Sequence, residues 1–295
     1  MARSKPHPVL GHTCLVTGRT LYVADLDGTL LGPDARVSEF TAHTLEQLMN
    51  DGVLITCATG RSWVTAQRVL GTFQVRLPVV LHDGTFIYDA VSDELLDQHV
   101  LSEPTVRSIV NMCRESGVPP LLYGMSGTQE QVSWVTSESN EGLDRFFAAR
   151  PADPRNAPRD RWRDLPTDGV FSIAATGASE SVHLLSAQIR RQLGDACEVT
   201  VQQDTYHPQD TWMAVVAANV SKAAAITRLA LMVEATRVVV FGDNINDLPM
   251  FEIADESYAV ANAVAEVRLA ATAVIGANHQ DGVARWLSDH AVAPE

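Results

Sequence analysis

Short apolar runs along the chain alternate with segments whose apolar residues recur every three or four positions. The runs at 21–24, 53–58, 79–81 and 238–241 have the length and composition of buried strands, and each ends at polar residues or Gly. The run at 86–88 follows so closely that a hairpin return is expected there. Strands that alternate with helices predict a doubly wound, mainly parallel sheet of the α/β class, with helices on both faces.

The helices between these strands have recognisable starting points. Ser38, Ser62 and Ser221 stand at or next to the start of segments of helical periodicity, and serine is a preferred N-cap residue. A shorter helix is expected after the strand at 238–241, with its apolar residues at Leu248, Met250, Phe251 and Ile253. A short strand at 258–260, followed by a helix, a strand and a last helix, completes the predicted core.

The pattern changes between residues 91 and 215. Helices are predicted at 103–116, 140–149 and 179–193, and strands at 119–124, 130–136, 169–175, 198–203 and 211–217. This αββαβαββ order places strands next to each other and therefore indicates antiparallel pairing in an α+β module. We expect an N-terminal extension at 1–19, a catalytic core at 20–90 and 216–295, and an inserted cap at 91–215.

Charge and cysteine content narrow the function classes. The formal net charge of −14 and the pI near 5.0 argue against a nucleic-acid or anionic-membrane surface, because such surfaces need clustered Lys and Arg. Cys14, Cys57, Cys113 and Cys197 form no Cys-x-x-Cys pair, so neither a zinc site nor a disulfide scaffold is expected. The first nineteen residues have no apolar signal-peptide region, and no run approaches the roughly 18 apolar residues of a membrane span. We therefore expect a cytoplasmic protein.

The first predicted strand ends in two carboxylates, Asp25 and Asp27. Alternate residues of a strand project from the same face, so these like charges share one side while Leu26 points away. One explanation is an ordinary solvated turn at Asp27 and Gly28. The other is a bound cation, or a reaction that needs one ionised and one protonatable carboxyl group.

Polar residues at later strand ends and helix starts favour the second explanation. They are Thr59, Lys222, Asp243, Asn246 and Asp247. Ligands of open parallel sheets bind beyond the carboxyl ends of the strands, so these groups are expected near the first carboxylate pair. Together they describe a phosphoryl-transfer site.

Each group has a chemical role in such a site. Asp25 can attack phosphorus as a carboxylate nucleophile, and Asp27 can protonate the leaving oxygen and later deprotonate water. The Thr59 hydroxyl, nearby backbone N–H groups and the Lys222 ammonium can hold the phosphoryl oxygens. The hard oxygen ligands that Mg²⁺ prefers would come from Asp25, Asp243 and Asp247.

The motifs that these residues form resemble those of the haloacid dehalogenase (HAD) superfamily. Four segments occur in that superfamily's order: Asp25-Leu26-Asp27-Gly28-Thr29-Leu30, Thr59-Gly60-Arg61, Lys222, and Gly242-Asp243-Asn244-Ile245-Asn246-Asp247. The inserted module resembles the type IIB cap of the Cof-like phosphatases. The similarity extends over residues 20–290.

The resemblance implies a role for each site residue. Asp25 is expected to be the nucleophile and a Mg²⁺ ligand, and Asp27 the acid/base whose backbone carbonyl also touches the metal. The remaining expected metal ligands are Asp243 and Asp247. Phosphate binding is expected from Thr59, Gly60, Lys222 and Asn246, with Lys222 also counted as catalytic.

One position departs from the family pattern. Relatives usually carry Asn-Gly where this chain has Asp83-Gly84. A carboxylate at this position would repel a substrate phosphate. Either Asp83 faces away from the site, or the substrate differs.

The core motifs account for phosphate and metal, so the leaving group is expected to be selected by the cap, which closes over the site. Candidates for substrate contact are Tyr123, Trp134, Arg159, Arg161 and Trp162. His183 and His207 are expected to be ordinary surface residues.

The leading hypothesis is a Mg²⁺-dependent phosphatase of a small phosphorylated metabolite, with sugar phosphates first and phosphorylated cofactors or polyols second. A phosphomutase that uses the same aspartyl phosphate is an alternative, although the last motif resembles Cof-like hydrolases more than phosphomannomutases. A metabolite-binding regulator on the same fold is the non-enzymatic alternative. Such a regulator should have lost Asp25, Asp27, Lys222 or Asp243, and all four are present. The sequence leaves the oligomeric state open.

Overall fold

The central sheet is parallel, as the alternation of strands and helices predicts. Its order is β13-β12-β11-β1-β2, formed by Ala273–Ile275, Glu256–Val260, Arg237–Gly242, Thr20–Ala24 and Leu54–Cys57. This computed structural model describes residues 18–71, 73–127, 129–204, 207 and 209–293. Most of the predicted extension at 1–19 lies outside these residues, as does Cys14.

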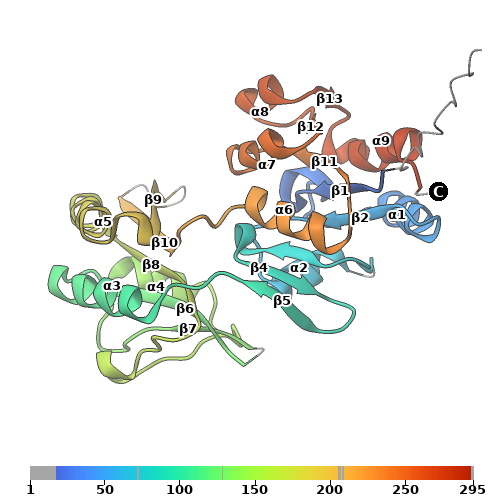
Figure 1. Cartoon of the computed structure of the whole chain (residues 1–295). Coiled ribbons are helices and arrows are strands. Elements are labelled where there is room, and N and C mark those ends of the chain that lie inside the picture. Colours follow the sequence, from blue (N-terminus) through green and yellow to red (C-terminus); the bar gives the residue numbers. More distant parts are fainter. Residues whose placement is uncertain (1–17, 72, 128, 205–206, 208, 294–295) are drawn as a thin grey trace, which may run out of the picture.

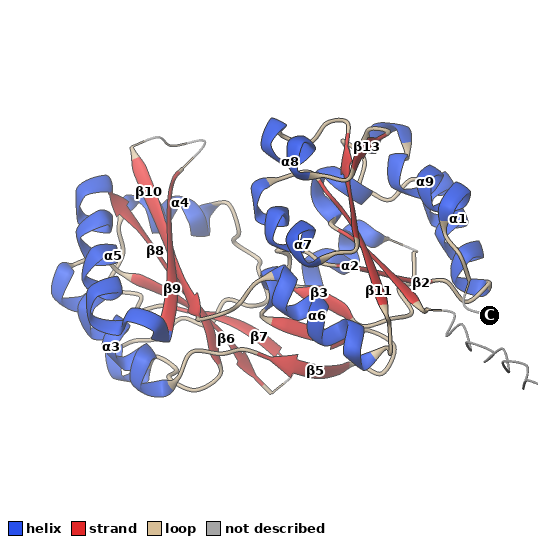
Figure 2. Ribbon diagram, turned by 45° about the horizontal axis from the view of Figure 1, so that its top comes forward, coloured by secondary structure: helices blue, strands red, loops and turns tan. Residues whose placement is uncertain are grey.

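Helices cover both faces of this sheet (Figure 2). On one face, α1 (Glu39–Asn50) packs against α9 (Gly282–His290), and on the other α6 (Lys222–Met232) packs against α7 (Leu248–Ile253). The remaining helices of this part are α2 (Trp63–Leu70) and α8 (Ala265–Ala270). The predicted doubly wound α/β fold is therefore confirmed.

The three predicted serine N-caps are confirmed. The side chains of Ser38, Ser62 and Ser221 accept hydrogen bonds from backbone N–H groups three residues later, at the starts of α1, α2 and α6. Of the apolar residues expected in α7, Met250 and Phe251 are buried, whereas Ile253 is 42% exposed. This helix is six residues long and ends at Ile253, so its last residue extends beyond the core.

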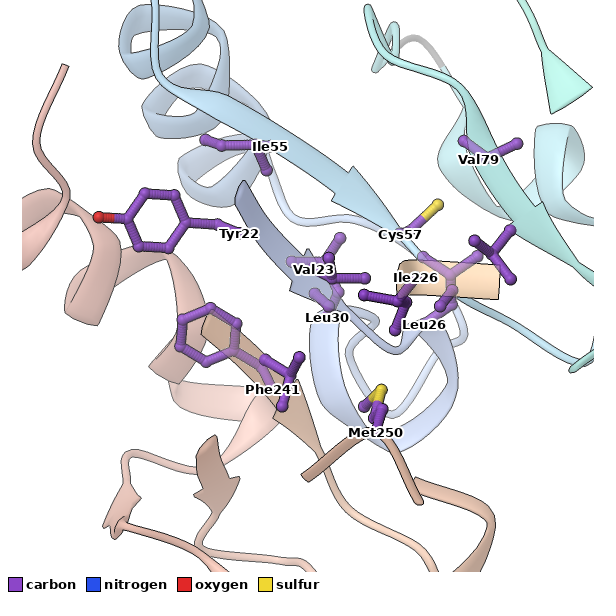
Figure 3. Packing of buried hydrophobic residues seen from close by; sticks show 14 of the residues in the cluster. Tyr22, Val23, Leu26, Leu30, Ile55, Cys57, Val79, Ile226, Phe241 and Met250 are labelled. Atoms are coloured by element: carbon purple, nitrogen blue, oxygen red, sulfur yellow. The ribbon is translucent and has the colours of Figure 1, made fainter. Parts of the chain in front are cut away.

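The core under the site is formed by side chains from several elements. Figure 3 shows Val23 of β1, Leu26 of the following turn, Ile226 of α6 and Met250 of α7 close together. All four are fully buried. Burial of a side chain of this size stabilises a fold by roughly 1.5–3 kcal/mol, so the turn after β1 is anchored by its own apolar residues.

The third predicted strand, β3 (Val79–Leu81), lies beside the parallel sheet but pairs mainly elsewhere. It forms an antiparallel sheet with β4 (Phe86–Asp89) and β5 (Glu94–Gln98). An isolated parallel bridge joins Val80 of β3 to Ala58, the residue that follows β2. The hairpin return is thus confirmed. β5 is not predicted from the sequence, because most of its side chains are exposed and lack apolar alternation. β5 ends at Gln98, and the expected start of the cap at residue 91 stays a prediction.

The inserted module has the predicted αββαβαββ order and forms an antiparallel cap (Figure 1). Its sheet order is β7-β6-β8-β10-β9, formed by Gln129–Ser133, Pro120–Ser126, Val170–Ala178, Asp210–Ala217 and Cys197–Gln203. The helices α3 (Glu103–Ser116) and α5 (Ser179–Leu193) lie on one face, and α4 (Glu141–Ala148) lies on the other (Figure 2).

A register shift in β8 connects the cap to the core. The pairing of β8 with β6 skips Phe171. The Phe171 side chain therefore does not lie on the α3/α5 face of the cap, and it packs into the hydrophobic cluster of the catalytic core. The Phe171 ring lies 4.7 Å from the His82 ring and 4.9 Å from the Phe86 ring. Glu130 of the cap also approaches His82, with 3.5 Å between the carboxylate and Nε2. The cap therefore contacts His82, the residue that directly precedes Asp83.

Two other sequence-based expectations concern cysteines and membranes. Cys57, Cys113 and Cys197 are free and buried. Within the described ranges, no helix is both long and apolar enough to cross a membrane.

The turn at His82–Gly84 packs directly against the start of α6, and we expect Gly84→Ala to destabilise the fold. Gly84 has φ +107°, and an added Cβ would lie 2.1 Å from the Ser221 carbonyl oxygen. Strain and overlap together should lower the free energy of unfolding by about 2–4 kcal/mol. Gly117→Ala is the matched control, because Gly117 has φ +68° with open space around it, and should cost about 1 kcal/mol. Equal losses in chemical denaturation would contradict this packing argument.

Candidate active site

Asp25 follows the last residue of β1 at the carboxyl edge of the parallel sheet. Its neighbours β11 and β2 bring Asp243 and Thr59 to the same edge, because these residues come just after the two strands end. The Asp25 amide donates to the Phe241 carbonyl at 2.9 Å, which ties the turn after β1 to β11. Asp25 is 6% exposed and Thr59 is 1% exposed. The predicted convergence of strand ends is therefore present.

Lys222, the first residue of α6, joins the two acidic motifs. Its Nζ donates to Asp25 Oδ1 at 2.6 Å and to Asp247 Oδ1 at 2.7 Å. All three side chains are buried. Because a buried charge is stable only when it is paired, the ammonium and the two carboxylates stabilise one another.

The pKa values reflect this burial. Burial raises the pKa of Asp25 to about 7, while the Lys222 ammonium opposes that shift. Burial by itself would lower the pKa of Lys222, but Asp25 and Asp247 outweigh it and raise that pKa. Burial also raises the pKa of Asp243. Lys222 thus stays protonated, and a further cation beside Asp25 would favour full ionisation of that carboxyl group at neutral pH.

Three carboxylates could hold such a cation. Asp25, Asp243 and Asp247 each present an oxygen within 4.8 Å of the other two. Hard oxygen ligands of this kind fit Mg²⁺. Asp243 Oδ1 accepts a hydrogen bond from the Thr29 hydroxyl at 3.1 Å, which orients this carboxylate. The donor set therefore fits the predicted metal.

Asp247 also accepts hydrogen bonds from the loop after β11 and from Lys222. Its Oδ2 accepts hydrogen bonds from the backbone N–H groups of Asp243 at 2.9 Å and Asn244 at 3.1 Å, and its Oδ1 accepts from Lys222. Asp247 thus holds the loop after β11 and the lysine together. Asp25 and Asp243 have fewer competing hydrogen bonds and are better placed as metal ligands.

Asp27 is bound by a residue to which the sequence analysis gave no role. Arg61 forms a two-pronged ion pair with it, with Nε 2.7 Å from Oδ2 and an Nη atom 2.6 Å from Oδ1. The Asp27 side chain is 52% exposed and lies outside the group of three carboxylates. A metal contact through the Asp27 backbone carbonyl stays a prediction. Arg61 could have been noticed because it directly follows Thr59 and Gly60 in the second motif.

The predicted phosphate-binding groups lie around Lys222. The Thr59 oxygen accepts a hydrogen bond from the Arg61 N–H at 3.2 Å, so its own hydroxyl proton can still be donated. The Asn246 amide donates to Asp83 Oδ1 at 3.2 Å, and this oxygen lies 3.9 Å from Lys222 Nζ. Asp83 therefore faces the site, so the first of the two alternatives, that it faces away, is wrong. A second group that sequence reasoning missed is Asn262, which donates to the Gly28 carbonyl at 2.7 Å.

The five cap candidates do not form one surface. Tyr123 lines a cavity of about 510 Å³ on the α4 face of the cap. Trp134 stacks on Phe147 beneath that face, and Arg159 donates to Gln131. Trp162 instead packs against the α3/α5 cluster, and Arg161 pairs with Asp164.

The two histidines also differ from each other. His183 is exposed, as expected for a surface residue. His207 lies in the wall of the cavity that Tyr123 lines. Only part of the cavity wall was therefore recognised from the sequence.

Comparison with known proteins agrees with this geometry. The model of the haloacid dehalogenase-like hydrolase family matches residues 22–287, so the chain belongs to that family. Similar curated proteins include 5-amino-6-(5-phospho-D-ribitylamino)uracil phosphatase YitU of Bacillus subtilis, 25% identical over 92% of this chain and 97% of the relative. Another is HMP-PP phosphatase of Yersinia pestis, 24% identical over 89% and 92% of the two chains.

Solved structures share the fold. TM0651 from Thermotoga maritima has a TM-score of 0.78 and 23% identity, over 93% of this chain and 98% of that chain. BT1666 from Bacteroides thetaiotaomicron, a phosphatase of the HAD superfamily, has a TM-score of 0.72 and 17% identity, over 97% and 98%. The chain is thus a HAD-type phosphatase, a phosphoric monoester hydrolase that acts on a phosphorylated metabolite.

The buried carboxylates predict a stability that depends on pH and on Mg²⁺. The folded-state pKa of Asp25 is near 7, above its usual 3.8, so folding favours the protonated form. This contribution is complete below about pH 4 and is lost as the pH rises toward 7. Without Mg²⁺, the melting temperature should fall over this range, and the stabilisation by Mg²⁺ should be larger at about pH 8 than at about pH 5. Asp25→Asn should weaken both trends in calorimetry; unchanged trends would contradict the assignment.

Proposed function

We propose that this protein is a Mg²⁺-dependent phosphomonoester hydrolase that works through an aspartyl phosphate on Asp25. The observation that carries the proposal is the buried Lys222 ammonium between Asp25 and Asp247, with Asp243 beside them. This arrangement combines a carboxylate nucleophile, a donor for phosphoryl oxygens and a set of hard metal ligands.

In the first step, an oxygen of Asp25 attacks phosphorus and the ester oxygen leaves with a proton from Asp27. In the second, Asp27 removes a proton from water, which attacks the same phosphorus and frees Asp25 and inorganic phosphate. Lys222, the Thr59 hydroxyl and the Gly60 N–H hold the phosphoryl oxygens, with Asn246 at the edge of the site. Mg²⁺ held by Asp25 and Asp243 would neutralise charge that accumulates on the phosphoryl group.

Asp27 must separate from Arg61 before it can act as an acid. A two-pronged ion pair with a guanidinium favours the ionised carboxylate, whereas the first step needs a proton on Asp27. We infer that substrate binding draws Arg61 away from Asp27. Arg61 is then free to contact the phosphate or the leaving group.

Two substrate classes are proposed. Sugar phosphates are the leading class, and phosphorylated cofactors or polyols are the second. The cavity on the α4 face supports the second class, because its lining residues Tyr123, Phe146 and Trp212, together with Arg145 and Arg150, suit a leaving group with a flat ring. The similar protein YitU is a phosphatase of 5-amino-6-(5-phospho-D-ribitylamino)uracil, a compound with a flat uracil ring.

We expect Mg²⁺-dependent hydrolysis of an aryl phosphate, and we expect Asp25→Asn to lower kcat by about 10³-fold or more, because the nucleophile is lost. Released phosphate is measured with and without Mg²⁺. Asp51→Asn is the matched control, since Asp51 lies exposed after α1, before β2 begins, and should retain full activity. Full activity in Asp25→Asn would refute the nucleophile.

A panel of sugar phosphates and phosphorylated heterocyclic compounds would then compare the two substrate classes by kcat/KM. Conversion of a sugar phosphate into an isomer without phosphate release would indicate a phosphomutase instead. Tight binding without turnover of any ester would indicate a metabolite-binding regulator.

A further inference from the structure

Asp83 is a carboxylate placed among the groups proposed to bind phosphate. Its Oδ1 lies 3.9 Å from Lys222 Nζ and accepts a hydrogen bond from Asn246 at 3.2 Å. Its Oδ2 lies over Gly60, where an added Cβ would be only 2.8 Å away. Three of the four phosphate-binding residues thus surround one acidic side chain that has no role in the two chemical steps.

The backbone holds this carboxylate in place. The Asp83 N–H donates to the Thr59 carbonyl at 3.0 Å, and the His82 N–H donates to the Arg61 carbonyl at 3.1 Å. His82 and Asp83 both have positive φ, +48° and +51°, a conformation that is uncommon outside glycine and costs energy. Gly84 then packs against the Ser221 carbonyl. The turn cannot relax without breaking these contacts, so the backbone of Asp83 is held where its carboxylate can approach Lys222.

The net negative charge of the site opposes the binding of an anionic ligand beside Asp83. Five carboxylates, those of Asp25, Asp27, Asp83, Asp243 and Asp247, face the two cationic groups of Lys222 and Arg61. The formal sum is −3, and a divalent cation would leave −1. A phosphate dianion would therefore enter a site that is still negative, and Asp83 is the carboxylate that the chemistry could do without.

We propose that Asp83 is a specificity-determining residue that competes with the phosphoryl oxygens for Lys222, Asn246 and Gly60. This inference rests on the proposed phosphatase function and deepens it. Because the phosphate group alone binds weakly, affinity has to come from the leaving group and its contacts with the cap. The enzyme thus selects esters with a large, cap-filling leaving group over small phosphate esters and free phosphate.

Asp83→Asn tests the competition with little change in shape. Asn has nearly the same size, tolerates positive φ and keeps an oxygen for Asn246, so the substitution removes mainly the charge. We expect the Ki of inorganic phosphate and the KM of a small aryl phosphate both to fall about tenfold, with kcat changed less than threefold. The decrease in Ki and KM should be smaller at high ionic strength, because salt screens the electrostatic repulsion between Asp83 and phosphate.

Discrimination between esters gives a second readout. The preference for an ester with a large leaving group over the small aryl phosphate, as a ratio of kcat/KM values, should decrease about tenfold in Asp83→Asn. Asp51→Asn removes the same charge at a distance and should leave Ki, KM and the ratio unchanged. An unchanged or higher Ki for phosphate in Asp83→Asn would overturn the proposal.

Two further measurements keep the test decisive. If Asp83→Asn folds poorly, Asp83→Gly removes the carboxylate and relieves the positive φ, and it should lower the Ki in the same direction. Calorimetric titration with inorganic phosphate and Mg²⁺ measures the competition without turnover. Absence of hydrolysis in the wild type would refute the proposed function, whereas equal phosphate affinity in the wild type and Asp83→Asn would refute the role of Asp83 alone.

Discussion

The buried ion pairs of Lys222 hold the active site together. A single ammonium at the start of α6 contacts Asp25 after β1 and Asp247 after β11, so it joins segments that are 197 and 25 residues away in the sequence. None of these charges could remain buried without the others, because an unpaired charge in this environment would cost several kcal/mol. The lysine is also unfavourable in the first turn of its helix, where the helix dipole is positive. Its position is therefore explained by the two carboxylates with which it forms ion pairs.

In the proposed mechanism, phosphate chemistry and substrate choice belong to different parts of the fold. The parallel sheet brings Asp25, Thr59 and Asp243 together at the ends of adjacent strands, whereas the antiparallel cap contains a cavity with aromatic walls. The two parts meet at His82, which contacts Phe171 and Glu130 of the cap and directly precedes Asp83 in the site. A movement of the cap would therefore act on the same turn that carries the acidic group beside Lys222.

Excess negative charge is the second constraint on this site. Arg61 neutralises Asp27, and Lys222 is shared between buried carboxylates, so Asp83 interacts with donors that are proposed to bind phosphate. A divalent cation held by Asp25, Asp243 and Asp247 would reduce this excess. The same charge balance explains why an acidic protein can act on an anionic metabolite: the favourable groups are few, local and directed at one position.

The sequence by itself determined the fold class, the order of the cap elements, the serine N-caps and the residues that converge on the site. Apolar periodicity specifies which strands are buried, and parallel strands bring their carboxyl ends to one edge. The sequence did not reveal β5, most of whose side chains are exposed. It also did not reveal the exposure of Ile253, which depends on where α7 ends. It also could not show that Arg61 binds Asp27, or that Asp83 faces Lys222. Those contacts join residues 34 and 139 positions apart, and side-chain direction at a positive-φ turn is decided only when α6 packs against it.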